Sequence, residues 1–242
     1  MNDFCGKKVL VTGSTQGIGL ATAKEFSALG GEVWIHCSHD IKKAERIANE
    51  IGAAHAVTAD LSDTNETLSL YRKTGSVDIL ILNASVQYKS YWKDITIDQF
   101  ENQVNVNLRS TFLLMQAYYP HMEKNHYGRI ITVGSVNQHR QHPELAIYAA
   151  TKCAVMSIVR NVAKTAAPHG VTINNISPGA ILTPRNESVW NDPQKRSAVE
   201  AQIPVGRFGN SEEIAKTIVF LCGENSEYFV GEDITIDGGM HL

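Results

Sequence analysis

Short apolar segments alternate with helix-period segments along almost the whole chain, and this alternation restricts the fold more than any other feature. The apolar segments predict seven strands, over Lys8–Thr12, Val33–Cys37, Ala54–Thr58, Asp78–Leu82, Arg129–Gly134, Thr172–Ser177 and Asp233–Ile236. Apolar residues at helical spacing predict helices between them, over Gly17–Leu29, Ile41–Ile51, Thr64–Lys73, Ile97–Lys124, Ala146–Ala167 and Ser211–Leu221. Strands joined through helices are typical of a parallel sheet covered on both faces. We therefore expect an α/β fold with a doubly wound, seven-stranded parallel sheet.

The length of 242 residues suits one large α/β domain, and the sequence contains no internal repeat, low-complexity tract or interdomain linker. We expect a single domain over residues 1–242. The least regular stretch, residues 182–208, contains Pro184, Pro193 and Pro204. Long segments without a regular pattern often carry function, so this stretch is predicted to form a flexible flap beside the substrate.

The charge balance excludes some classes of partner. Lys and Arg number 22, Asp and Glu number 25, and no basic run is present, so we expect no nucleic-acid partner. The N-terminal residues lack the apolar core of a signal peptide, and no apolar run approaches the roughly 20 residues that span a membrane. We expect a cytoplasmic protein with no membrane partner.

The cysteines and histidines form no metal-binding or redox motif. Four scattered cysteines without Cys-x-x-Cys spacing favour reduced thiols, and nine histidines occur without a His-Glu-x-x-His motif or a dense cluster of ligands. We expect no metal site. His139 and His142 lie in a polar run after the fifth predicted strand, which forms either a solvated loop or the rim of a pocket.

A glycine-rich turn, Gly13-Ser-Thr-Gln-Gly-Ile-Gly19, follows the first predicted strand. Gly13, Gly17 and Gly19 permit a tight turn and close approach of the backbone to a pyrophosphate, which the amides and dipole of the next helix would attract. The spacing differs from Gly-x-Gly-x-x-Gly, and no Lys-Ser/Thr follows as in a P-loop. An ordinary strand-to-helix turn is the alternative.

Tyr148 and Lys152 are four residues apart in a predicted helix, so they lie one turn apart on the same face. An ammonium group beside a phenol stabilises the phenolate and makes proton exchange near neutral pH feasible. Tyr148 is therefore a candidate acid/base. The alternative is a tyrosine that packs under the apolar stem of a lysine.

Together the two motifs resemble the short-chain dehydrogenase/reductase family, whose members share a Thr-Gly-x-x-x-Gly-x-Gly cofactor turn and a Ser, Tyr-x-x-x-Lys active site. The resemblance covers almost the whole chain and implies a Rossmann-type sheet with hydride transfer between a nicotinamide and a carbonyl or secondary alcohol. It implies that Ser135 orients the substrate oxygen, Tyr148 passes the proton, Lys152 supports it and binds the nicotinamide ribose, and Asn107 holds a water. A satisfied core asparagine is the alternative for Asn107.

The resemblance also implies a cofactor site beyond the carboxyl ends of the strands, where doubly wound sheets bind ligands. Besides Tyr148 and Lys152, its predicted residues are Gly13, Ser14, Thr15, Gln16, Gly17, Ile18, Gly19, Ser38, His39, Asp60, Leu61, Asn83, Ala84, Pro178, Gly179, Ile181 and Thr183. For Asp60 the alternative is a turn or helix-capping role. Leu82 and Ser85 depart from the family motif Asn-Asn-Ala-Gly, of which Asn83 and Ala84 remain.

The end of the second predicted strand bears on the choice of nicotinamide. Cys37 stands where an acidic residue would bind the ribose 2′-hydroxyl of NAD, so a 2′-phosphate meets no repulsion there. Ser38 and His39 can donate hydrogen bonds to such a phosphate. We expect NADP(H), with NAD(H) as the alternative.

Residues that follow the strand ends predict a mixed, polar substrate pocket. Its expected contacts are Ser85, Gln87, Asn137, Gln138, His139, Ala180 and Arg185, with Tyr88 and Trp190 as further candidates. A sugar acid, polyol or keto acid suits this lining, and Arg140 or Arg185 can meet a carboxylate. The enzymatic alternative is a 3-oxoacyl thioester (carrier-protein) reductase, and the alternative of another class is a non-catalytic nucleotide-sensing protein.

The resemblance implies a homo-oligomer, either a tetramer or a dimer, built on the two long helices. Leu108, Phe112, Met115 and Tyr119 form an apolar stripe that is compatible with such an interface. Ordinary core packing explains the same stripe.

Overall fold

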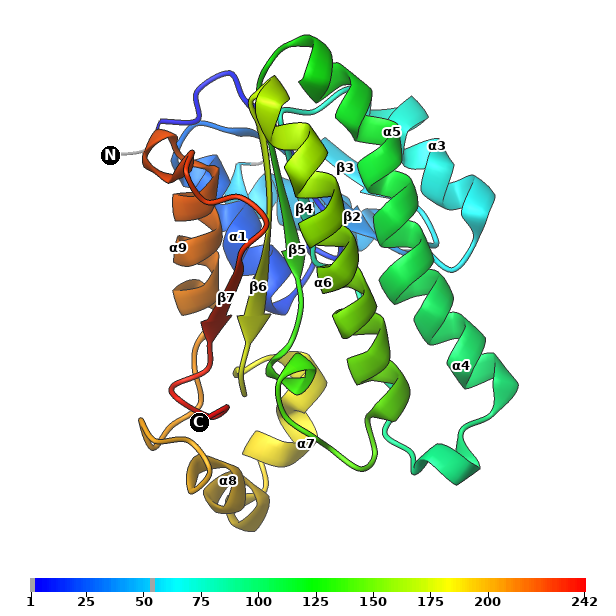
Figure 1. Ribbon diagram of the computed structural model, residues 1–242, viewed down its shortest axis with the longest axis vertical. Coiled ribbons are helices and arrows are strands. Elements are labelled where there is room, and N and C mark those ends of the chain that lie inside the picture. Colours follow the sequence, from blue (N-terminus) through cyan, green and yellow to red (C-terminus); the bar gives the residue numbers. More distant parts are fainter. Residues whose placement is uncertain (1–2, 53–54) are drawn as a thin grey trace.

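A computed structural model describes residues 3–52 and 55–242, and these form a seven-stranded sheet in the order β3-β2-β1-β4-β5-β6-β7 (Figure 1). The strands are β1 (Lys8–Val11), β2 (Glu32–Cys37), β3 (His55–Thr58), β4 (Ile79–Leu82), β5 (Gly128–Val133), β6 (Val171–Pro178) and β7 (Asp233–Ile236). Each described pair of neighbours runs parallel. The predicted fold class is confirmed. Ala54, the predicted first residue of the third strand, lies outside the described residues.

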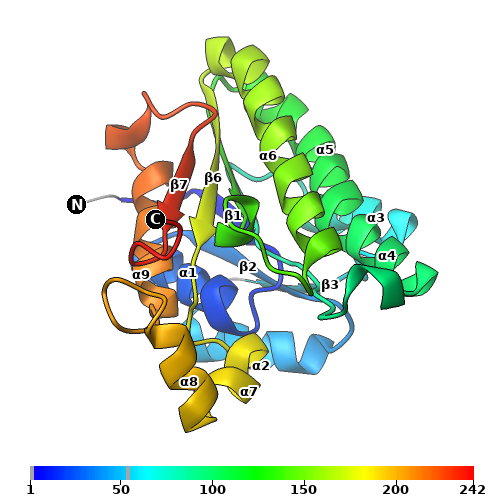
Figure 2. The same ribbon diagram turned by 60° about the horizontal axis from the view of Figure 1, so that its bottom comes forward.

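Helices cover both faces of the sheet (Figures 1 and 2). One layer contains α1 (Gly17–Ala28), α2 (Ile41–Ile51) and α9 (Ser211–Cys222), and the other contains α3 (Thr64–Thr74), α5 (Ser110–Lys124) and α6 (Ala146–Ala166). Successive strand residues point to opposite faces, so Val9 packs into the first layer with Phe26, whereas Leu10 packs into the second with Leu70. All four side chains are completely buried. Two apolar cores thus fix the sheet from both sides.

The long helix predicted over Ile97–Lys124 is divided in the structure. It begins as α4 (Ile97–Gln103), passes through a π-helical turn over Val104–Arg109, and continues as α5. The prediction of one uninterrupted α-helix was wrong. The wider turn places Asn107 on the inside, where its side chain is 1% exposed, and single π-helical turns occur frequently at functional sites.

The stretch 182–208 contains more regular structure than its sequence pattern predicts. It forms the short helices α7 (Glu187–Trp190) and α8 (Pro193–Glu200). The Asp192 carboxylate accepts hydrogen bonds from the backbone N–H groups of Gln194 and Lys195, and Pro193 occupies the first helical position, where its missing N–H group is not needed. The expectation of an irregular loop was wrong, whereas its movement as a flap stays a prediction.

The chain leaves β1 toward β2 on one side, and β4 returns on the other side of β1. The strand order therefore reverses between β1 and β4. In open parallel sheets a crevice forms at this point, beyond the carboxyl ends of the strands. The glycine-rich turn after β1 and Asn83 after β4 both lie at this position.

Candidate active site

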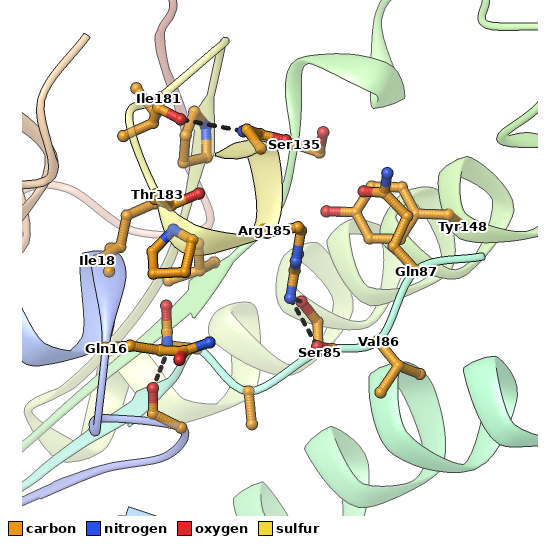
Figure 3. Close-up of a pocket in the computed structure, with 18 of the residues that line it drawn as sticks. Gln16, Ile18, Ser85, Val86, Gln87, Ser135, Tyr148, Ile181, Thr183 and Arg185 are labelled. Carbon is orange, nitrogen blue, oxygen red and sulfur yellow. Dashed lines mark hydrogen bonds between the residues drawn. The ribbon is translucent and has the colours of Figure 1, made fainter. Parts of the chain in front are cut away.

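A cavity of about 910 Å³ opens beyond the carboxyl ends of the strands. Its lining includes the turn after β1, the ends of β2 to β6 and part of the stretch 182–208 (Figure 3). Most of the predicted cofactor and substrate residues line this one cavity: Gly13, Thr15, Gln16, Gly17, Ile18, Ser38, His39, Asp60, Leu61, Asn83, Ala84, Ser85, Gln87, Ser135, Asn137, Tyr148, Pro178, Gly179, Ala180, Ile181, Thr183 and Arg185.

The glycine-rich turn is held tightly against β4. Gly13 and Gly17 have φ of 63° and 55°, in the left-handed region that favours glycine. A Cβ atom on Gly19 would lie 2.5 Å from the Gly13 carbonyl oxygen and 2.6 Å from Asn83 Nδ2. The Asn83 amide donates hydrogen bonds to the carbonyls of Thr12 (2.9 Å) and Gly13 (3.1 Å). Gly19 therefore supports the turn from behind instead of facing the cavity.

His36 on β2 anchors the same turn through Ser14 and Gly13. The fully buried Ser14 hydroxyl accepts a hydrogen bond from the His36 N–H at 2.9 Å. Ser14, one of the predicted cofactor residues, does not line the cavity. His36 Nδ1 accepts from the Gly13 N–H at 3.0 Å, and Nε2 lies 3.1 Å from the Ala59 carbonyl. Burial lowers the pKa of His36 to about 4, so its ring is neutral. Sequence reasoning missed His36, although a histidine within an apolar strand was a signal.

Polar side chains that follow β2 and β3 lie close together in the cavity lining. His39 Nε2 lies 3.7 Å from the Asp60 carboxylate, which also accepts a 2.8 Å hydrogen bond from the Ser62 N–H. Burial alone would raise the pKa of Asp60, but the Ser62 hydrogen bonds and His39 lower it overall. Asp60 therefore both lines the cavity and forms the turn offered as its structural alternative. Lys43 lines the cavity as well and was not predicted.

The two departures from the Asn-Asn-Ala-Gly motif have separate structural explanations. Leu82 is 5% exposed and packs in the core between the sheet and α5 and α6. Ser85 accepts two hydrogen bonds from Arg185 Nη2, at its carbonyl oxygen (2.6 Å) and at its hydroxyl (2.9 Å), as Figure 3 shows. A glycine at position 85 would supply only the first of these contacts.

Ser135 and Tyr148 face the cavity, and Lys152 lies behind them. Ser135 follows β5 and is 7% exposed, and its hydroxyl accepts a hydrogen bond from the Asn137 N–H at 3.2 Å. Lys152 Nζ lies 5.6 Å from the centre of the Tyr148 ring and donates a 2.7 Å hydrogen bond to the Val133 carbonyl. Burial, with a further contribution from the Arg185 charge, lowers the pKa of Lys152 to about 7.

Asn107 connects the loop after β4 to the helix that carries Tyr148. Its Oδ1 accepts from the Val86 N–H at 2.8 Å, and its Nδ2 donates to the Val86 carbonyl (2.9 Å) and to the Thr151 hydroxyl (3.2 Å). The Thr151 hydroxyl in turn donates to the Tyr148 carbonyl at 2.7 Å. The side chain is thus fully paired, as the alternative of a satisfied buried asparagine requires.

Gln138 and His139 were predicted to contact the substrate, but their side chains turn away from the cavity. Gln138 Nε2 and His139 Nε2 lie 3.0 Å and 2.9 Å from the Asp233 carboxylate on β7, and neither residue lines the cavity. Gln138 Oε1 accepts a hydrogen bond from the Ser135 N–H at 3.1 Å. Gln138 therefore supports Ser135, and the cavity is lined by Arg140 and His142 instead.

The residues present fit a dinucleotide. The cavity lining includes both the turn at Gly13 and Thr183, which follows β6, and a Cβ atom on Gly17 would lie 3.3 Å from Thr183 Cγ2. The glycines of the turn at the N-terminus of α1 leave room for a pyrophosphate, and the turn presents amides to it. The lining at the place expected for the ribose combines neutral polar groups and Lys43 with the carboxylates of Asp40 and Asp60.

The chain belongs to the short-chain dehydrogenase/reductase family, since a family model described as enoyl-(acyl carrier protein) reductase matches residues 13–241. It is an oxidoreductase that interconverts CH–OH and C=O groups with NAD(P), as the sequence predicts.

Two curated relatives and one solved structure illustrate this membership. Glucose 1-dehydrogenase of Gluconobacter oxydans is 37% identical over 99% of this chain and 93% of its own length. The 3-oxoacyl-(acyl-carrier-protein) reductase of Escherichia coli is 32% identical over 99% of both chains. A provisionally named NAD(P)-dependent gluconate 5-dehydrogenase of Beutenbergia cavernae, with NADP bound at low occupancy, is 28% identical over 98% of both chains with a TM-score of 0.92.

No helix in residues 3–52 and 55–242 combines the length and apolar character needed to cross a membrane. Within the same residues, no three or more His, Cys, Asp or Glu side chains gather as they would around a metal ion.

Proposed function

We propose that the protein is an NADP(H)-dependent oxidoreductase that acts on the carbonyl or secondary alcohol of a small polar substrate. One observation carries the proposal: Ser135 and Tyr148 line the same cavity as the glycine-rich turn, with the Lys152 ammonium behind the tyrosine ring. A purely structural tyrosine and lysine pair would not require this shared cavity.

Within this proposal Tyr148, Ser135 and Lys152 have different tasks. The Tyr148 hydroxyl gives a proton to the substrate oxygen or takes one from it, as general acid/base groups do. The Ser135 hydroxyl already accepts from the Asn137 N–H, so its own proton is available for the same substrate oxygen. Lys152 stabilises negative charge on Tyr148. When it is bound, the nicotinamide supplies or accepts the hydride.

The preference for NADP(H) is supported by the groups around the end of β2. Cys37 leaves the last residue of that strand without a carboxylate, and Ser38, His39 and Lys43 line the cavity after it. Asp40 also lines the cavity, but its carboxylate caps α2 by accepting a hydrogen bond from the Lys43 N–H. A lysine ammonium and neutral donors suit a 2′-phosphate, whereas NAD-specific sites place an acidic residue there. The gluconate 5-dehydrogenase with bound NADP has the same fold.

Two other functions compete with this proposal. A 3-oxoacyl thioester reductase is favoured by the likeness to the Escherichia coli enzyme. A nucleotide-sensing protein without catalysis is disfavoured because Ser135 and Tyr148 line one cavity, with Lys152 and Asn107 buried in the structure that carries them.

The decisive experiment replaces one oxygen. Tyr148→Phe is expected to reduce turnover by about 10²- to 10⁴-fold, the usual contribution of a general acid/base, while NADPH still binds. Turnover is measured as NADPH oxidation with keto acids, keto sugars and acetoacetyl thioesters, and binding by calorimetry. Tyr228→Phe is the matched control, since Tyr228 is fully exposed and lies outside the cavity. Equal turnover in Tyr148→Phe and wild type would refute the assignment.

The remaining expectations belong to the same proposal. We infer a single catalytic domain in the cytoplasm whose stretch 182–208 moves over the substrate, and a homo-oligomer that pairs α5 and α6. An apolar groove between these helices supports the oligomer; its lining residues are Phe112, Met115, Gln116, Tyr119, Ile130, Ile158, Val162, Thr165, Ala166 and Ile173.

A further inference from the structure

The cavity carries its charged groups in two separate places. Both carboxylates in its described lining, Asp40 and Asp60, follow β2 and β3. The lining near Ser135 and Tyr148 contains the cations Lys89, Arg140 and Arg185, together with His142, whose pKa is lowered by burial, and no carboxylate among the described residues. Charges of one sign in a concave site focus the electrostatic potential and concentrate the opposite ion. The reactive end of the cavity is therefore built to attract an anion.

The two arginines at this end have only neutral partners. Arg140 Nη2 donates to Gln202 Oε1 at 3.0 Å, and Arg140 Nη1 is buried without a hydrogen-bond partner. Arg185 Nη2 donates to the Ser85 carbonyl and hydroxyl. In the described part of the chain neither guanidinium forms an ion pair with a carboxylate. A buried donor without a partner is costly, so the Arg140 contact set is incomplete without a further acceptor.

Both arginines also connect the body of the protein to the stretch 182–208. Arg140 precedes α6 and reaches Gln202 after α8, whereas Arg185 begins this stretch and reaches back to Ser85 after β4. Figure 3 shows the Arg185 side chain crossing the cavity toward Ser85, between Thr183 and Tyr148. An anion held by both guanidinium groups would lie inside the cavity beside the reacting oxygen. This location suits a small molecule better than the surface of a carrier protein.

We propose that Arg140 and Arg185 bind the carboxylate of the substrate, which makes the enzyme selective for hydroxy and keto acids, sugar acids included. The inference rests on the proposed oxidoreductase function and specifies its substrate class. A carboxylate accepts paired N–H donors from guanidinium groups, so it offers an acceptor for Arg140 Nη1 and replaces the Ser85 contacts of Arg185. Ser85 then serves as the acceptor that keeps Arg185 in place before the substrate arrives.

The experiment compares an acid with its ester. Acetoacetate and methyl acetoacetate have the same reactive carbonyl and differ in charge, and reduction of each is followed with NADPH. Wild type is expected to prefer acetoacetate in kcat/KM by about tenfold or more, because the ester has no carboxylate and leaves the guanidinium charges unpaired. Arg140→Gln and Arg185→Gln are each expected to reduce this acid-to-ester ratio by about tenfold or more. Arg196→Gln is the matched control, since Arg196 lies in α8, pairs with Glu200 at 2.9 Å and does not line the cavity.

The outcomes separate this inference from the proposed function. Equal kcat/KM for acid and ester in wild type, or unchanged ratios in both arginine variants, would overturn the carboxylate site while NADPH oxidation still upheld the oxidoreductase. A higher kcat/KM for an acetoacetyl thioester than for acetoacetate would also overturn it in favour of the carrier substrate. If no carbonyl is reduced, the proposed function fails, and calorimetry with malonate and neutral malonamide then tests the carboxylate site. Binding of malonate alone, weakened in both arginine variants, supports the site. Equal binding of malonate and malonamide rejects the site.

Discussion

Lys152 is an ammonium-bearing side chain that the fold removes almost completely from water. It is 4% exposed, and its one hydrogen bond in the described structure is to the Val133 carbonyl. A carbonyl dipole compensates only part of the lost hydration, and the Arg185 charge adds repulsion. Lys152 therefore supports Tyr148 at a cost to the folded state.

This cost predicts a pH dependence of stability. The pKa of Lys152 is about 7 in the folded protein against 10.5 as its ordinary value, so between these values the unfolded chain binds more protons. The contribution of Lys152 to the unfolding free energy therefore rises with pH between about 7 and 10.5, by at most about 1.4 kcal/mol per pH unit. Urea unfolding at pH 7.5 and 9.5 should give a smaller increase for Lys152→Met than for wild type. Equal increases in the two proteins would contradict the assigned burial effect.

The same scale shows what residue spacing can and cannot predict. Tyr148, Lys152 and Ser135 were found because a four-residue helical spacing and a strand end fix where side chains lie. Gln138 and His139 were misplaced because a short capping turn after β5 directs them to Asp233, almost a hundred residues away along the chain. The orientation of a side chain in a turn depends on partners that are distant in the sequence, and a local sequence pattern does not predict them.

At the level of elements, the start of α1 has little tolerance for an added methyl group. Alanine at position 19 would place its Cβ atom 2.5 Å from a backbone oxygen and 3.0 Å from Ser14 Cα. Neither atom belongs to a flexible side chain, so the turn after β1 must move. The geometry of the proposed pyrophosphate site therefore depends on one missing methyl group.

Gly19→Ala is expected to lower the unfolding free energy by about 1–3 kcal/mol, as overpacking does, and to weaken NADPH binding. Denaturant unfolding and calorimetric titration check the two effects. Lys24→Ala serves as the control in the same helix because Lys24 is exposed, and it should stay within about 0.5 kcal/mol of wild type. Unchanged NADPH affinity in Gly19→Ala would show that the turn does not hold the cofactor.

The elements themselves were predicted to different degrees. Ile41–Ile51 and Asp233–Ile236 were predicted to the residue, because apolar periodicity and capping signals agree there. The π-helical turn at Val104–Arg109 was missed, since one added residue hardly alters a helical pattern. The helices α7 and α8 were missed because they are short, although Asp192-Pro193 was an N-terminal signal.

For the whole molecule, the apolar groove between α5 and α6 is the feature that bears on assembly. Its volume is about 220 Å³, and Phe112 on its rim is 43% exposed. Of the predicted stripe of Leu108, Phe112, Met115 and Tyr119, the last three line this groove, although Met115 is only 5% exposed and belongs to the core. Core packing thus explains Met115, whereas the exposed Phe112 suits an oligomer interface.

Phe112→Asp is expected to dissociate the proposed oligomer, because a charge in an apolar interface loses its hydration. Light scattering after size-exclusion chromatography should give a mass nearer to that of one chain. Phe220→Asp is the matched control: Phe220 is also 43% exposed but lies on α9, in the opposite layer. Dissociation by Phe220→Asp alone would move the interface to the other face of the sheet.

The edge strand β7 is joined by hydrogen bonds to the loop that begins at Ser135. Asp233 at its start is bound by Gln138, His139, Asn175 and Ser177, and Gln138 holds the backbone of Ser135. A nascent chain that stops short of Asp233 has made the other six strands of the described sheet yet lacks this carboxylate as an anchor for the loop. Such a polypeptide would have a complete dinucleotide turn, whereas Ser135 would be held less firmly until β7 docks on the sheet.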